Sequence, residues 1–359
     1  MLTSASKEEI LTRREFFRKS AKAALTVGAL YNLSAVMGCG GLSFKEEEPV
    51  IYPPLRGQKV QPPEYGCYIG FHSSAIHNHI HGTFEWLEER TGKAPKIIVP
   101  PYSQMMSNTS IWLWGDLRTK PLDIIPHHRA TPFLYRDITS DLVGIRFENL
   151  PGDKVFGRKI EQYARNVVKL GKPLFFTTMQ EMNLPKKWTM GPWGQQPRAF
   201  KDVWRYMWQI FEDTGANEYA TWVWEIYSPY TSPNVGSPER YYPGDKYVDW
   251  IGFSVYSHDQ FQVQRKPFSQ LIGPTYSHLR KRHPEKPIMI AEFGKTKSSR
   301  QSRWIEQAYG YIKSRPGIKA AVYWDNVSGH LGIDYSHHLS EESWIKLKEI
   351  FKDDYWIGA

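Results

Sequence analysis

The sequence contains few cysteines and no long apolar run. Only 2 of its 359 residues are cysteine, which is too few for a disulfide framework or a four-cysteine metal site. No apolar run reaches the roughly 20 residues that a membrane-spanning helix needs, so a multi-span membrane protein is excluded. Hydrophobic residues at 41% and charged residues at 23% are ordinary for a folded globular chain, which excludes a disordered or fibrous protein.

Motifs that bind phosphates or present a nucleophilic serine are also missing. The chain has no G-x-G-x-x-G and no G-x-x-x-x-G-K-[ST] segment, so a nucleotide-binding fold would lack its phosphate turn. No G-x-S-x-G segment follows an apolar run, and a Ser-His-Asp triad therefore has no support. The net charge of +9 is not gathered into a dense Lys/Arg stripe, and we expect no nucleic-acid partner.

Aromatic residues, in contrast, are abundant. The chain holds 14 Trp and 21 Tyr. Such an excess has two interpretations, either a bulky core or flat platforms on which ligands such as sugars stack.

Residues 1–39 have the pattern of an export signal. Arg13 and Arg14 precede an apolar stretch over 23–30, and small residues follow it. The paired arginines resemble a twin-arginine signal, which implies export to the cell envelope or beyond. Cys39 follows Val-Met-Gly and resembles a lipoprotein box, whose cysteine carries a lipid anchor. The alternatives are cleavage nearby to give a soluble secreted protein, or an uncleaved N-terminal anchor.

Residues 40–63 have the composition of a tether between that signal and a folded domain. They contain three consecutive glutamates at 46–48 and prolines at 49, 53, 54, 62 and 63, which make a segment polar and stiff. Residues 64–359 form the predicted catalytic domain. With Cys39 lipidated, Cys67 has no cysteine partner, and no intrachain disulfide is expected.

One pattern repeats after residue 63: a short apolar run, a polar break and a segment with helical periodicity. Apolar runs with β-branched or aromatic residues are typical of strands buried on both faces of a parallel sheet. The predicted strands are 65–71, 95–99, 132–135, 173–178, 220–224, 250–255, 287–291 and 320–324. The predicted helices are about 80–91, 155–170, 197–213, 268–282, 299–314 and 341–352.

Eight such alternations predict an α/β fold, a single (β/α)8 TIM barrel. A doubly wound open sheet is the structural alternative, but its glycine-rich turn is absent. Active sites of these barrels lie where the strands end at the C-terminal face. The polar residues that close each predicted strand are therefore the candidates for chemistry.

Two glutamates occupy such positions. Glu181 follows the fourth predicted strand, and Glu292 follows the seventh. A single glutamate there is equally consistent with an ion pair or a loop cap. Strands four and seven face each other across a barrel mouth, which allows the roughly 5–5.5 Å separation of carboxyl groups found in retaining glycosidases. In that mechanism one carboxyl group donates a proton and the other attacks the anomeric carbon.

Three segments resemble glycoside hydrolase family 26. They are Glu181-Met-Asn183 with Trp188 and Trp193-Gly194 downstream, the run from Tyr241 to Gly252, and Lys286-Pro-Ile-Met-Ile-Ala-Glu-Phe-Gly294. The resemblance covers most of residues 64–352. That family belongs to a large clan of retaining (β/α)8 glycosidases and is best known for β-mannanases.

The resemblance implies roles for particular residues. Glu181 would be the acid/base and Glu292 the nucleophile of a retaining endo-β-glycosidase that needs no cofactor or metal and acts on β-1,4-mannan or a related β-linked polysaccharide. Gln180 stands where the family usually has histidine. Its amide could hydrogen-bond the sugar's 2-hydroxyl, but it cannot become cationic, which leaves the preferred sugar open.

Other residues near the strand ends are candidate substrate contacts. Tyr256 would hydrogen-bond the nucleophile, and Trp324 would form the floor of the sugar subsite. Trp188 and Trp193 could stack on further sugars, and His72 could line the pocket. Structural packing is the alternative for each of these side chains.

Three further features have competing interpretations. Glu225 follows the fifth predicted strand and could exchange roles with Glu181. Asp249 precedes the sixth strand, at the opposite end of the barrel, and is expected to be structural. His77, His79 and His81 alternate like metal ligands, but no acidic cluster accompanies them, so exposed histidines are favoured.

The sequence thus predicts an exported, monomeric glycosidase whose partner is a polysaccharide or oligosaccharide and whose only membrane contact is a lipid anchor. The enzyme alternative is a retaining glycanase of other specificity, such as β-1,3-xylan or mixed-linkage β-glucan. The alternative from another class is a non-catalytic surface barrel that binds carbohydrate.

Overall fold

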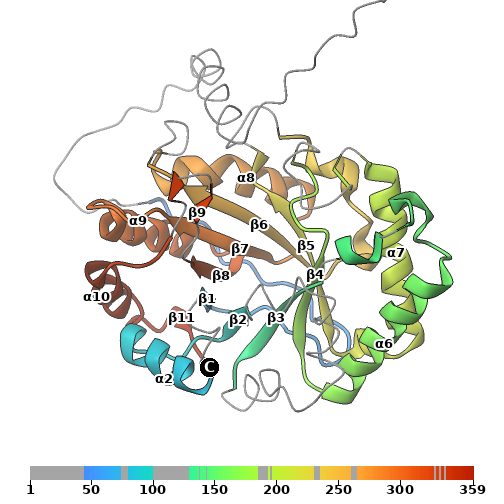
Figure 1. The fold of residues 1–359 in the computed structure, drawn as a ribbon. Helices are drawn as coiled ribbons and strands as arrows, with labels where there is room; N and C mark the ends of the chain where they lie inside the picture. The colour runs from blue at the N-terminus through green and yellow to red at the C-terminus, as the bar shows by residue number, and fades with distance from the viewer. Residues whose placement is uncertain are drawn as a thin grey trace, which may run out of the picture.

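Eight parallel strands close into a barrel in the computed structural model (Figure 1). The structure describes residues 44–73, 80–99, 129–136, 138–142, 144–184, 193–194, 196–229, 235–259, 265–326, 329–330, 333–334 and 337–359. The strands pair in chain order, and β8 closes the barrel against β1. The barrel strands are β1 (Cys67–Ser73), β2 (Ile97–Val99), β3 (Thr131–Arg136), β4 (Leu174–Thr178), β5 (Ala220–Tyr227), β6 (Trp250–Ser257), β7 (Ile288–Lys295) and β8 (Ile318–Asp325). The predicted (β/α)8 barrel and its eight strands are confirmed.

Helices surround the strands, as Figure 1 shows. The six predicted helices are all present, with ends within a few residues of those expected from the sequence. They are α2 (Ile80–Thr91), α6 (Lys154–Leu170), α7 (Pro197–Asp213), α8 (Phe268–Arg282), α9 (Gln301–Lys313) and α10 (Glu341–Ile350). Smaller elements complete the described chain: 3-10 turns η4 (Thr139–Leu142), η5 (Phe147–Asn149), η6 (Ala216–Glu218), η8 (Pro238–Tyr241) and η9 (Asp245–Tyr247), the short strands β9 (Gly329–His330) and β10 (Ile333–Asp334), and β11 (Trp356–Ile357), which pairs with β1.

Local chemistry fixes both ends of α6. In α6 the carboxylate of Asp153 accepts a hydrogen bond from the backbone N–H of Phe156 at 2.7 Å, and this satisfies one of the free donors at the helix start. The helix ends at Gly171, whose left-handed φ of 58° suits glycine because it has no Cβ. None of the helices in the described residues is long and apolar enough to cross a membrane.

Alternate residues of each strand belong to two separate cores. On β8, Val322 and Trp324 belong to the interior cluster of the barrel, while Tyr323 belongs to the cluster between the strands and the helices. This period of two is the geometry of a pleated strand covered on both faces. An inward position near the C-terminal end of a strand therefore faces the barrel mouth.

A bulge in β7 interrupts this alternation next to Glu292, one of the two glutamates predicted to carry the chemistry. Phe253 of β6 pairs with Ile290, but the next residue, Ser254, pairs with Glu292, so β7 carries one extra residue there. Ala291 belongs to the interior cluster and Phe293 to the outer one. Because the extra residue resets the alternation, Glu292 follows Ala291 on the inward face, as β-bulges commonly do when they redirect a side chain.

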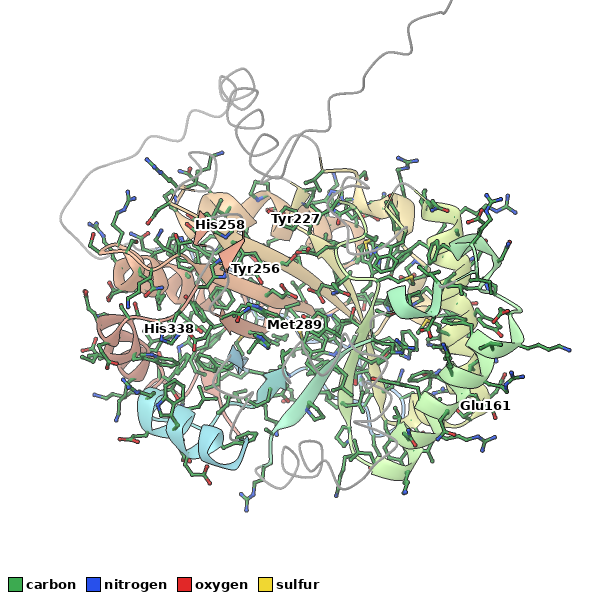
Figure 2. All side chains as sticks on the ribbon, viewed as in Figure 1. Glu161, Tyr227, Tyr256, His258, Met289 and His338 are labelled. Carbon is green, nitrogen blue, oxygen red and sulfur yellow. The ribbon has the colours of Figure 1, made fainter. Side chains whose placement is uncertain are left out.

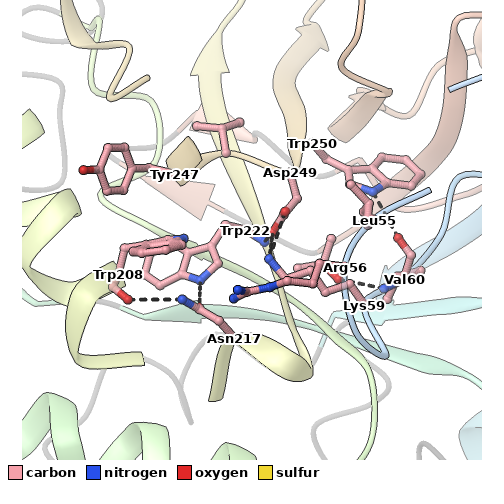
Figure 3. A network of polar contacts seen from close by, with 12 residues as sticks. Leu55, Arg56, Lys59, Val60, Trp208, Asn217, Trp222, Tyr247, Asp249 and Trp250 are labelled. Carbon is pink, nitrogen blue, oxygen red and sulfur yellow. Dashed lines mark hydrogen bonds and ion pairs between the residues drawn. The ribbon is translucent and has the colours of Figure 1, made fainter. Parts of the chain in front are cut away.

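Residues 44–63 lie against the base of the barrel, at the N-terminal ends of the strands. Lys59 places its ammonium group 2.7 and 2.9 Å from the carboxylate oxygens of Asp249 (Figure 3). The backbone N–H of Val60 donates to Thr221 Oγ1 at 2.8 Å. This part of the segment with tether-like composition is therefore packed on the barrel. Asp249 has the structural role expected of it, since its carboxylate also accepts from the backbone N–H of Trp222 at 2.8 Å.

Candidate active site

Glu181 lies in a tight turn directly beyond β4. Its backbone has a left-handed φ of 54°, and Met179 has a φ of 53°. Such values are uncommon for residues with a Cβ and cost on the order of 1–3 kcal/mol each unless the surroundings hold them. The backbone N–H of Glu181 donates to the carbonyl of Glu225 on β5 at 3.1 Å. On the other side, the hydroxyl of Ser254 on β6 donates to Oε1 of Glu181. The turn and its half-buried side chain are thus held by two neighbouring strands.

Glu292 lies on the inward face of β7 and is 9% exposed. The hydroxyl of Tyr256 donates to its Oε2 at 2.5 Å, which is the hydrogen bond expected from the sequence. Ser254 and Tyr256 are two positions apart on β6, so both point inward. One strand therefore presents a hydroxyl to each of the two glutamates, and the predicted pair is brought to one end of the barrel.

The electrostatics of this group favour retention of protons. Burial raises the pKa of Glu292 to about 8, the negative charge of Glu181 adds to the rise, and the hydroxyl of Tyr256 opposes it. Burial, together with the charge of Glu292, raises the pKa of Tyr256 well above its usual value, so this phenol remains a donor at neutral pH. Neighbouring carboxyl groups cannot all ionise at once, and the donated hydrogen bond favours charge on Glu292.

Glu225 belongs to the same group but has a different environment. It lies on the inward face of β5 and is 0% exposed. Burial, followed by the charges of Glu292 and Glu181, raises its pKa well above the usual value. A general acid must reach the glycosidic oxygen of the substrate. The half-buried Glu181 has that access and the enclosed Glu225 has not, so the geometry favours Glu181 for this role.

His72 and Trp324 pack against each other at the C-terminal ends of β1 and β8. Their rings stack with centroids 3.9 Å apart and an interplanar angle of 20°. The Nδ1 atom of His72 lies 3.3 Å from the carbonyl oxygen of Val99, which fixes the imidazole. The indole of Trp324 also meets the ring of Tyr135 at 6.0 Å in a T-shaped contact. The structure therefore brings these two predicted pocket residues together.

The other predicted substrate contacts do not all lie at the barrel mouth. Gln180, immediately before Glu181, is 5% exposed. Trp193 is 1% exposed and packs at 6.1 Å against Phe147 in the core outside the barrel, which favours its packing interpretation. Trp188 lies outside the described residues.

The cysteine predicted to carry a lipid and the three alternating histidines were also singled out in the sequence. Cys39, His77 and His79 lie outside the described residues, and so does the side chain of His81. Within the ranges that are described, no group of three His, Cys, Asp or Glu residues could hold a metal ion. Cys67 is free and buried there.

Two sets of site residues escaped prediction from the sequence. Ser254 could have been found, because it lies two positions before Tyr256 on the same strand and must share its face. The histidine pair could not, since its members come from distant segments. His337 stacks on the ring of Tyr256 at 4.5 Å, and its Nε2 lies 2.9 Å from Nε2 of His258. Figure 2 shows Tyr256 beside His258, with Met289 nearer the centre of the ribbon.

A closed (β/α)8 barrel with carboxyl groups from two strands at the mouth is the architecture of many glycoside hydrolases. Comparison with protein families identifies which family of glycoside hydrolases this chain belongs to. The model of glycosyl hydrolase family 26 matches residues 133–326, more than half of the chain. The chain belongs to this family and is a glycoside hydrolase, which decides against the non-catalytic alternative.

Individual relatives agree with this assignment. Endoglucanase H of Acetivibrio thermocellus is 28% identical over 179 residues, which are 46% of this chain and 19% of that protein. The family 26 domain of an endo-β-mannanase/endo-β-glucanase from Prevotella bryantii has a TM-score of 0.58 at 19% identity, over 82% of this chain and 91% of that one. The catalytic domain of an endo-β-1,4-mannanase from a Bacillus species has a TM-score of 0.61 at 15% identity, over 82% and 87%. At such identities the structural matches show the common fold.

Proposed function

We propose that this protein is a retaining endo-β-glycosidase that hydrolyses β-1,4-mannan or a related β-linked polysaccharide. The observation that carries the proposal is the pairing of Glu181 and Glu292 with two hydroxyls of one strand, Ser254 and Tyr256. This arrangement holds two carboxyl groups of different exposure at the end of the barrel where such enzymes act.

The two carboxyl groups take complementary parts in a double displacement. The carboxylate of Glu292 attacks the anomeric carbon while the protonated carboxyl of Glu181 donates its proton to the departing glycosidic oxygen. The resulting glycosyl-enzyme ester is hydrolysed by water, whose proton returns to Glu181. Tyr256 stabilises the carboxylate of Glu292 before attack and after release.

Mannan is the first candidate substrate because β-mannanases share the fold and the sequence resembles their family. A β-glucan is the second candidate, favoured by the match to an endoglucanase. Gln180 beside the acid/base supplies an amide for a sugar hydroxyl, where the family usually has an imidazole.

The test is release of reducing ends from a panel of mannans, glucans and xylans by a chain that begins at or before residue 44. The matched control is Glu292→Ala, with folding checked by circular dichroism. We expect release from mannan or β-glucan and its loss in the variant. A folded wild-type protein with no activity on any polymer, or full activity in Glu292→Ala, would contradict the proposal.

We propose further that the protein is exported as a monomer and anchored by a lipid on Cys39. Cells given a labelled fatty acid should produce a labelled protein, and Cys39→Ala should carry no label. Label in that variant would exclude Cys39 as the site. Light scattering of the released domain should give the mass of one chain, and a dimer mass would exclude the monomer.

A further inference from the structure

Glu225 is a fully buried carboxyl group that the double displacement does not use. It lies on the inward face of β5, and its strand partner on β6 is Gly252. The space beside that glycine is occupied, since a Cβ there would lie 2.8 Å from Val223 Cγ1 and 3.4 Å from Glu225 Cγ. The missing side chain of Gly252 thus makes room for Glu225 in the barrel interior.

No described residue places a positive charge beside this group. Neither carboxyl oxygen of Glu225 has a hydrogen-bond partner among the residues that the structure describes. No salt bridge within the same residues involves it. An ionised carboxylate in such a place is strongly disfavoured, whereas the neutral acid loses far less on leaving water.

The titratable groups that face Glu225 come from every neighbouring part of the barrel. They are Tyr135 on β3, Glu181 after β4, Tyr256 on β6 and Glu292 on β7. Two are acids and two are phenols, and none supplies a positive charge. Any negative charge on the glutamates therefore adds to the effect of burial, and both keep the proton on Glu225.

Tyr135 connects this acid with the proposed nucleophile. Its hydroxyl is buried and has no hydrogen bond to any described residue in this conformation. It is close enough to Glu225 and Glu292 to lower the pKa of both carboxyl groups. A proton on Glu225 can be donated to the Tyr135 oxygen, which leaves the phenolic O–H free to donate to Glu292.

We propose that Glu225 is a third carboxyl group of the site, that it is held as a neutral acid, and that it positions Tyr135 against Glu292. The positioning role rests on the proposed function of Glu292, while the neutral state of Glu225 does not. No bond to substrate is involved, so Glu225 acts through its neighbours.

Infrared spectroscopy tests the neutral state without any substrate. At pH 7 the full chain should show carbonyl stretches of protonated carboxyl groups, and the difference spectrum between wild type and Glu225→Gln should show the loss of one buried protonated carboxyl group. Loss of an ionised carboxylate band in that variant, with the protonated band unchanged, would overturn the proposal. Glu225→Met, which is similar in size and has no charge, serves the same comparison if the glutamine variant does not fold.

Thermal unfolding gives a second test of the same state. A carboxyl group whose pKa is raised by folding makes the native state less stable as pH rises above its unfolded value of about 4.3. Glu225→Gln should therefore gain Tm relative to wild type between pH 5 and pH 8. Glu212 has its pKa lowered by Arg56, so its contribution to stability is already complete at pH 5, and Glu212→Gln should have a Tm below wild type by an amount that stays constant over the same range. A pH-independent difference for Glu225→Gln would contradict a neutral Glu225.

Kinetics test the positioning role. Glu225→Gln keeps a donor and should retain most of kcat, whereas Glu225→Met should lose about tenfold in kcat, the effect of one lost hydrogen bond, with little change in KM. Equal activity of the two variants would overturn the positioning role. An inactive but folded wild-type protein would overturn the proposed function and this role together, and the spectroscopic and thermal results would still decide the state of Glu225.

Discussion

The hydroxyl of Tyr256 donates a hydrogen bond of 2.5 Å to Oε2 of Glu292. The two residues lie on adjacent strands, and a bulge in β7 turns Glu292 toward the phenol. Behind the phenol, the stacked ring of His337 supports it, and burial lowers the pKa of that imidazole well below its usual value, so it stays neutral. The contact between Tyr256 and Glu292 is thus held by packing as well as by the hydrogen bond.

Removal of this hydroxyl should change the pH dependence of the enzyme. The hydrogen bond lowers the pKa of Glu292 against the effect of burial, so Tyr256→Phe should raise it. Because the nucleophile acts as the carboxylate, the acid limb of the kcat/KM profile should move upward by about one to two pH units, since a hydrogen bond to a charged group contributes about 1.5–3 kcal/mol. Tyr276→Phe, which removes a hydroxyl bonded to Glu47 near the base, is the control. An unchanged acid limb in Tyr256→Phe would contradict this role.

The hydroxyl of Ser254 should matter for the acid/base residue. It donates to Oε1 of Glu181, and its loss removes one of the contacts that orient this half-buried carboxyl group. Ser254→Ala should lower kcat about tenfold, equivalent to about 1.4 kcal/mol in the barrier, with KM nearly unchanged. Ser228→Ala removes another buried hydroxyl, bonded to Thr275 at 2.7 Å, and should leave kcat as it is. Equal effects of the two substitutions would indicate a general packing defect.

Trp324 belongs to the barrel interior and Trp193 to the outer core, so replacing each by alanine should affect different properties. Trp324 stacks with His72 at the C-terminal ends of β8 and β1, so Trp324→Ala should raise KM for the polysaccharide about tenfold, equivalent to about 1.4 kcal/mol of lost binding energy. Trp193 is buried in the outer core, so Trp193→Ala should lower the free energy of unfolding by about 3–5 kcal/mol. Kinetics and chemical denaturation measured on both variants separate the two roles. A large KM effect of Trp193→Ala with normal stability would restore its predicted place in the substrate site.

The base of the barrel should depend on one ion pair. The side chain of Lys59 is 5% exposed and that of Asp249 is 15% exposed. Asp249→Ala leaves a buried ammonium group without its partner and should destabilise the fold by about 3–5 kcal/mol. The double variant Lys59→Met/Asp249→Ala should recover part of this loss, because the unpaired charge is gone. Denaturant midpoints measure both, and a double variant less stable than Asp249→Ala would disprove the explanation.

The segment 44–63 should contribute to the thermal stability of the barrel. Residues 44–63 contribute the buried Tyr52 and Val60 as well as Lys59. A chain that begins at residue 64 should therefore unfold at a lower temperature than one that begins at residue 44. Differential scanning calorimetry of both chains gives the comparison, and equal transition temperatures would show that the packed segment adds no stability.

The sequence alone determined the number and order of the strands and helices and the two glutamates at strand ends. Apolar runs and helical periodicity are local properties of the chain, so they can be recognised without knowing which segments become neighbours in the fold. The inward direction of Tyr256 also follows from strand alternation within β6. The family resemblance rested on the same local segments, such as Lys286–Gly294.

Relations between distant segments were decided by the tertiary structure. The bulge that turns Glu292 inward exists only between paired strands, because register depends on the neighbours of β7 and not on its own sequence. The extent of burial distinguishes the enclosed Glu225 from the more accessible Glu181, and it shows that Trp193 belongs to the outer core. Composition gave residues 44–63 a tether-like character, whereas Lys59 found its partner 190 positions away. Burial, register and charge pairing depend on what surrounds a residue, and only the closed barrel supplies those surroundings.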